Sequence, residues 1–214
     1  MSSEKSLKDQ NQHLIIAAIV IHAVIFIGIA LKPLETFNLS KPELFEHLKK
    51  LIAPGSLGFT GILIATLLLR GLLPSLWRDR LVHWRWHNPL PGSRAFTVIG
   101  PKDARVNMQS LNSRYGPLPT DPAEQETRFY AIYKEHQDAV GVRDAHKSYL
   151  ALRDIAVITF LFTPALPLAA YVLTGDHILA FKYLGALFLA FVVISWAAKT
   201  YAARLIENTL STAS

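Results

Sequence analysis

The 214-residue chain contains no cysteine. Disulfide bonds, thiolate metal sites and thiol nucleophiles are therefore excluded. The chain also lacks the short motifs that mark many enzymes, including a phosphate-binding glycine loop, a Gly-x-Ser-x-Gly turn and a dinucleotide fingerprint. Its carboxylates do not cluster at the spacing of metal ligands. The sequence alone therefore predicts no catalytic residue, no metal site and no cofactor.

Charge is almost absent from four long stretches, which are residues 13–31, 51–69, 155–173 and 178–198. The first contains His22 near its middle, and the last contains Lys182 near its start. A helix that spans a bilayer needs about 20 mostly apolar residues. The sequence therefore predicts an all-α integral membrane protein with four transmembrane helices.

The distribution of lysine and arginine predicts how these helices are oriented. Thirteen of the 22 basic residues lie between residues 70 and 154, whereas the connection 32–50 has four lysines that three glutamates offset. The cytosolic side of a membrane protein is the richer in lysine and arginine. We therefore expect residues 70–154 and both termini in the cytosol. The expected location is the plasma (cell inner) membrane, with the lipid bilayer as a direct partner.

These two patterns divide the chain into five parts. The cytosolic part between the second and third spans is long enough to form a small α-rich domain. The predicted parts are an N-terminal tail at 1–12, two spans with an outer interfacial helix at 41–52 within 13–74, a cytosolic domain at 75–154, two further spans within 155–198, and a C-terminal tail at 199–214.

The first segment of the predicted domain, residues 75–87, is rich in tryptophan and arginine. Trp77, Leu81 and Trp84 follow one another at i, i+4 and i+7, so they would share one face of a helix. Indole and guanidinium groups both favour the headgroup layer of a bilayer. We therefore expect a helix that lies in the membrane interface.

The rest of the domain contains both strand-like and helical patterns. Residues 95–99 are β-prone, and residues 104–108 have the composition to pair with them as a short β-hairpin. Asp121 and Pro122 form a typical helix start, with a capping carboxylate followed by proline at the first helical position. A second amphipathic stretch, residues 142–154, leads directly into the third span.

Several cationic side chains of the domain are candidates for docking a ligand or a soluble protein partner. His83 and His87 are four residues apart, the spacing of a metal-binding pair on a helix, but no glutamate or nearby third ligand accompanies them. Arginines beside them could hold a phosphate group. The candidate docking residues are Arg78, His83, Arg85, His87, Arg94, Arg143 and His146.

Three residues within the spans are candidates for a role inside the membrane. His22 is ionisable at mid-membrane depth, where such groups are costly and often functional. The alternative, which we favour, is a neutral histidine that is hydrogen-bonded to a neighbouring helix. Pro164 and Pro167 each remove a backbone donor from the third span and so favour a bend. A bent span can act as a hinge.

Two classes of function fit this layout. The first is a non-enzymatic membrane subunit that assembles with copies of itself, and its active form would be a gated pore or membrane effector. A small protein of this layout would fit an effector of bacterial stress or antiviral (phage) defence, which is an analogy of layout alone. The second is an enzyme that acts on lipid headgroups or other phosphates through His83 and His87. Nucleic-acid binding has less support, because the net charge over residues 70–154 is only +4, thirteen basic minus nine acidic.

Overall fold

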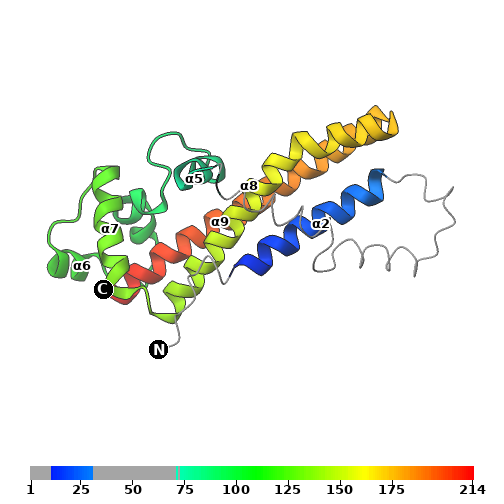
Figure 1. Ribbon diagram of the computed structural model, residues 1–214. Helices are drawn as coiled ribbons and strands as arrows, with labels where there is room; N and C mark the ends of the chain where they lie inside the picture. The colour runs from blue at the N-terminus through cyan, green and yellow to red at the C-terminus, as the bar shows by residue number, and fades with distance from the viewer. Residues whose placement is uncertain (1–10, 31–70, 72) are drawn as a thin grey trace. The chain divides into compact units, whose positions relative to one another are not determined.

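The computed structural model describes residues 11–30, 71 and 73–214, and every regular element in these ranges is helical. Three helices, α2, α8 and α9, are long and apolar enough to cross a membrane. The predicted all-α architecture is confirmed for the described residues, and three of the four predicted spans lie in helices of the required length and composition. The helices are α2 (Gln12–Ala30), α5 (Ser75–His83), α6 (Met108–Tyr115), α7 (Pro122–His136), α8 (Val140–Thr174) and α9 (His177–Ala213), with the short segments η1 (Pro91–Arg94), η2 (Ala95–Ile99) and η3 (Gly100–Lys102) between α5 and α6 (Figure 1).

Two further sequence predictions concern segments outside the described residues. They are the span at 51–69 and the outer helix at 41–52. Both stay predictions. The described part of the chain divides into two compact units, and each is considered by itself.

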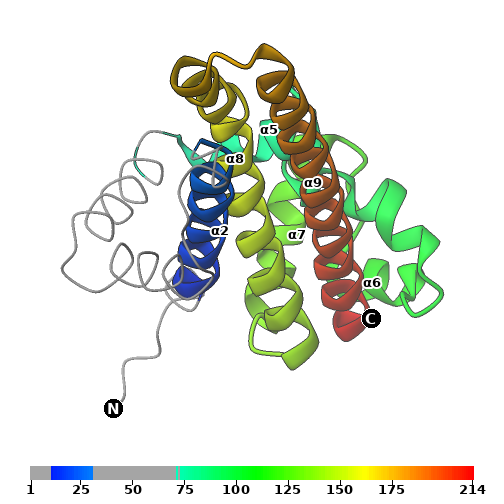
Figure 2. The same cartoon turned by 90° about the vertical axis from the view of Figure 1, so that its right-hand side faces the viewer.

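The first unit, called here the membrane unit, comprises residues 1–74 and 157–192. Its described part contains α2 and the apolar segments of α8 and α9, which run side by side (Figure 2). Ile15 and Ile19 of α2 pack against Ile158 of α8. Tyr183 of α9 packs against Ala170 of α8. These contacts join the three helices that the structure describes in this unit.

Many large apolar side chains of the membrane unit point outward. Val172 on α8 is 72% exposed and Phe181 on α9 is 73% exposed. A soluble protein seldom exposes a large contiguous apolar surface, because contact with water is unfavourable for it. Lipid or another protein is needed to cover this surface, as expected of helices that cross a bilayer.

The second unit, called here the helical domain, comprises residues 75–156 and 193–214. It contains α5, the three short segments, α6, α7, the first turns of α8 and the last turns of α9. Phe96, Leu111 and Ile132 are buried in its core together with Ile206 and Leu210 of α9. The residues after 198 thus continue α9 and help to form the core of the domain.

The expected β-hairpin is wrong, because residues 95–99 form a π-helical turn and residues 104–108 contain no strand. The fully buried side chain of Gln125 explains this outcome. Its Oε1 accepts hydrogen bonds from the backbone N–H groups of Phe96 (3.0 Å) and Thr97 (3.3 Å). These donors are satisfied without a partner strand, and β-propensity yields to such tertiary context.

Candidate functional site

Helices α5 and α8 each bury a pair of polar residues four positions apart. Asp79 and His83 lie on α5, and Tyr149 and Arg153 lie on α8; all four side chains are buried. Residues four apart share one face of a helix. Each helix therefore presents a polar face to the interior of the helical domain, where an unpaired polar group would be costly.

The buried groups form a continuous chain of contacts, called here the ion network. The Tyr149 hydroxyl donates to Asp79 Oδ1 over 2.6 Å, and Arg153 Nη1 lies 3.3 Å from the same oxygen. Arg153 Nη2 lies 3.1 Å from Oδ1 of Asp154, which also pairs with Arg78 Nη1 at 3.3 Å. Two arginines thus alternate with two carboxylates, so the charges of the network balance.

His83 is next to this network and is held in its neutral form. Its Nε2 is 3.2 Å from the Tyr149 hydroxyl oxygen, which already donates its proton to Asp79. His83 Nε2 is therefore the donor in this contact. Burial lowers the pKa of His83 to about 4, and the positive charges of Lys199 and Arg94 act in the same direction.

A cavity of about 140 Å³ lies beside the ion network within the helical domain. Asp79 and Tyr149 belong both to the network and to the wall of this cavity. Its other polar lining side chains are Glu126, Tyr130, Tyr133 and His146.

Glu126 gives the cavity its distinctive chemistry. Its Oε2 atom is buried and has no hydrogen-bond partner among the described residues. Burial, reinforced by the charge of Asp79, raises the pKa of Glu126 to about 7. Gly92 permits this close packing, because a Cβ atom there would lie 2.5 Å from the Phe129 ring and 2.6 Å from Glu126 Oε2.

The structure brings three of the predicted docking residues to this region. Arg78 belongs to the ion network, and His83 contacts it through Tyr149. His146 lines the cavity, and its Nδ1 is 2.7 Å from the Tyr133 hydroxyl oxygen.

The remaining predicted docking residues do not line the cavity, although, in addition to burial, the charges of Arg94 and Arg85 are close enough to His83 to lower its pKa. Helix α5 ends at His83, so the exposed His87 does not share a helical face with it. Arg85 and Arg143 are exposed, and Arg94 is partly buried at the end of η1. In the described ranges, no three histidine, aspartate or glutamate side chains converge as a metal site would require.

Three tryptophans in and after α5 are exposed and are called here the tryptophan surface. Trp77, Trp84 and Trp86 are 43%, 56% and 67% exposed. The Arg80 guanidinium lies 4.8 Å from the centre of the Trp77 ring, and Lys199 Nζ lies 3.2 Å from that of Trp84. Indoles and cations are thus adjacent, as the headgroup layer favours. That this surface contacts the membrane stays a prediction.

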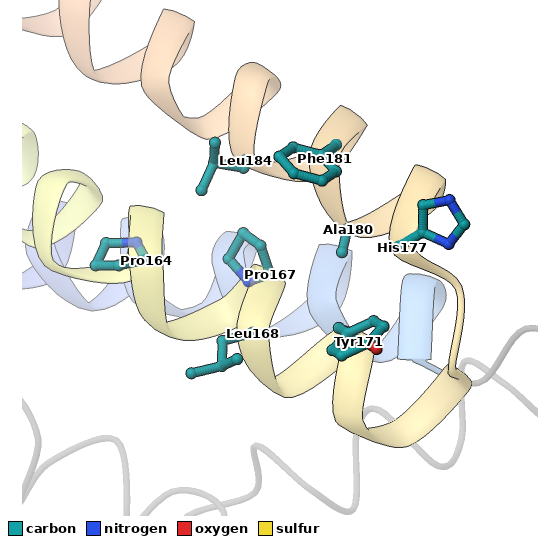
Figure 3. A pocket seen from close by; sticks show the side chains of 8 residues that line it. All are labelled: Pro164, Pro167, Leu168, Tyr171, His177, Ala180, Phe181 and Leu184. Atoms are coloured by element: carbon teal, nitrogen blue, oxygen red, sulfur yellow. The ribbon is translucent and has the colours of Figure 1, made fainter.

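The residues predicted to act inside the membrane occupy two places in the membrane unit. His22 is buried, donates from Nδ1 to the Ala18 carbonyl oxygen over 2.7 Å, and lies against the Phe162 ring. Pro164 and Pro167 line an apolar groove of about 420 Å³, on the side of α8 that faces α9 (Figure 3). Helix α8 continues through both prolines.

The site contains residues that the sequence predictions omitted. Asp79, Glu126, Tyr149 and Arg153 carry most of its chemistry, yet none belongs to a motif. The sequence does show two polar residues four positions apart in α5 and two in α8. This spacing indicates a site only once the two helices are known to be in contact.

No protein-family model, curated protein or solved structure matches this chain. The fold and the site define a class only: a helical protein whose described residues include three helices apolar enough to cross a membrane, with a buried ion network at the start of one of them.

Proposed function

We propose that the protein is a non-enzymatic, multi-pass membrane subunit whose helical domain binds a ligand or soluble partner and transmits that event along α8. The observation that supports this best is the sharing of Asp79 and Tyr149 between the cavity and the ion network. Helix α8 carries Tyr149, Arg153 and Asp154, and it continues from them into its apolar segment without a loop.

The physical basis of the transmission is the cost of an unpaired buried charge. A group that enters the cavity and bonds to Asp79 competes with Tyr149 and Arg153 for the same carboxylate. Removing one partner from a buried ion pair typically costs about 3–5 kcal/mol. In the proposal, α5 and α8 avoid this cost by exchanging the partners of their buried side chains. The two sets of partners are two discrete arrangements, and a ligand can select one of them.

The proposed location, orientation and assembly of the protein follow from the sequence. The helical domain and both termini lie in the cytosol, and the spans assemble with further copies in the plasma (cell inner) membrane. The exposed apolar surface of the membrane unit supports contact with lipid or with another copy. A gated pore or membrane effector, as in bacterial stress or antiviral defence, is the active form we propose to test. The enzymatic alternative has weaker support, because His83 is buried while His87 is exposed.

A probe on α8 tests the proposal directly. The chain has no cysteine, so Leu168→Cys can be spin-labelled without background, and Leu168 is 64% exposed. We expect Asp79→Asn, which removes the charge that pairs with Arg153, to change the spectrum of this label in proteoliposomes.

The matched control is Asp103→Asn, which alters an ion pair at the surface of the same domain, Asp103–Arg105 at 2.6 Å, whose arginine side chain is 58% exposed. It should leave the spectrum unchanged. Identical spectra for folded Asp79→Asn, Asp103→Asn and the parent would show that the network does not communicate with the apolar part of α8.

A further inference from the structure

Aromatic rings form a large part of the wall of the cavity in the helical domain. Phe129, Tyr130, Tyr133 and Tyr149 all line it. Tyr130 and Tyr133 are stacked with ring centres 6.0 Å apart, and Phe129 lies 6.5 Å from Tyr133. The face of an aromatic ring attracts cations through its quadrupole. Tyr130 already illustrates this, because Lys134 Nζ lies 4.8 Å from its ring centre.

The charges around the cavity leave one acidic group over. The two arginines of the ion network balance Asp79 and Asp154. Glu126 is a third carboxyl group outside this network, and its buried Oε2 makes no hydrogen bond to the described residues. Burial raises its pKa and outweighs the nearby backbone N–H groups of Ser93 and Gly92, which lower it. A buried acceptor without a donor is unfavourable, so a ligand that supplies a donor and positive charge would be stabilised here.

The size of the cavity limits the ligand. Its volume is about 140 Å³. A cavity of about 150 Å³ in another protein holds one benzene molecule, so this one suits a group of about six non-hydrogen atoms.

We propose that this cavity binds a small organic cation, an ammonium or guanidinium group held between Glu126, Asp79 and the aromatic rings. The inference rests on the proposed function and names the ligand class of the same site. An anion would meet two carboxyl groups, and a neutral apolar molecule would leave Glu126 Oε2 without a donor. A positively charged head with N–H or polarised C–H groups satisfies both the rings and the carboxyl groups.

Binding of simple probe ions to the full chain in detergent tests the inference. The probes are tetramethylammonium and ethylammonium chloride, with tert-butanol as the neutral match and sodium acetate as the anion. Saturation-transfer NMR at pH 8 should show saturable binding of the two ammonium ions only. Glu126→Gln should weaken ethylammonium binding about tenfold or more, because a hydrogen bond to a charged group is lost. It should also weaken tetramethylammonium binding, because the attraction of the carboxylate charge is lost.

Two further variants make the result specific. Glu124→Gln alters an exposed carboxyl group on the same helix and should leave binding unchanged. Tyr130→Leu removes a half-exposed ring and should weaken tetramethylammonium binding. If Glu126→Gln does not fold, this variant still tests whether the aromatic rings bind the cation. Equal binding of tert-butanol, no saturable ammonium binding, or unchanged affinity in both cavity variants would overturn the inference.

The outcome can be separated from that of the proposed function. Ammonium binding without any response of the label at residue 168 would retain the cation site and reject transmission along α8. A label that responds to Asp79→Asn in a protein that binds no ammonium ion would reject the cation site and retain the transmission.

Discussion

Glu126 couples the stability of the helical domain to pH. Its carboxyl group titrates near pH 4.5 in the unfolded chain and near pH 7 in the folded protein, since burial and Asp79 raise the pKa to about 7. The folded protein therefore binds this proton more tightly than the unfolded chain. The stabilisation is complete below about pH 4.5 and is lost as the pH rises through about 7. His146 and Tyr149 of α8 also face this cavity.

We therefore expect Glu126→Gln to stabilise the protein at pH 8 by about 1–3 kcal/mol and to have little effect at pH 4.5. Chemical unfolding of the two proteins at several pH values measures the difference. Glu124→Gln should show no such dependence. A Glu126→Gln effect that is the same at pH 4.5 and pH 8 would contradict the shifted titration.

The buried polar pairs on α5 and α8 depend on each other, so the loss of a single side chain should lower the stability of the protein strongly. Arg153→Met should destabilise the protein by about 3–5 kcal/mol, because Asp79 and Asp154 stay buried without their shared partner. Equilibrium unfolding in detergent measures this change. Arg105→Met, which removes a guanidinium from an ion pair at the surface of the domain, should have little effect.

A compensating substitution distinguishes lost pairing from lost packing. Asp79→Asn combined with Arg153→Gln leaves fewer unpaired charges than Arg153→Met, so the double variant should recover part of the stability. A double variant less stable than the sum of its single substitutions would assign the effect to packing instead.

Elements that depend only on neighbouring residues were predictable from the sequence. The start of α7 is confirmed, because Asp121 accepts from the N–H groups of Ala123 (2.9 Å) and Glu124 (3.1 Å) and Pro122 follows it. Capping depends on a few neighbouring residues, so it is visible in sequence. Apolar length is equally local, and it identified α2, α8 and α9.

Features that depend on distant residues were not predictable. The turn at residues 95–99 is fixed by Gln125, which lies 28 and 29 positions away from the two backbone groups that it binds. Asp79 and Tyr149 are 70 residues apart, so neither shows a partner in its own segment. The cavity could be found only after such contacts were known.

The orientation of the whole molecule can be measured with single cysteines. The lysine and arginine distribution predicts the helical domain in the cytosol and the turn between α8 and α9 outside. We expect a membrane-impermeant maleimide to label His177→Cys on intact cells and Ser113→Cys only after permeabilisation; both positions are exposed. Labelling of Ser113→Cys alone on intact cells would invert the orientation.

The contribution of α9 to the core of the helical domain has a consequence for biosynthesis. Phe96, Leu111 and Ile132 are synthesised early, but Ile206 and Leu210, which help to bury them, leave the ribosome only after residues 177–198. Until then the unfinished domain presents apolar side chains to the surrounding solution, a state prone to aggregation and to capture by chaperones. Its closure is thereby tied to membrane insertion of α8 and α9, so a chain that fails to insert them is left open to proteolysis.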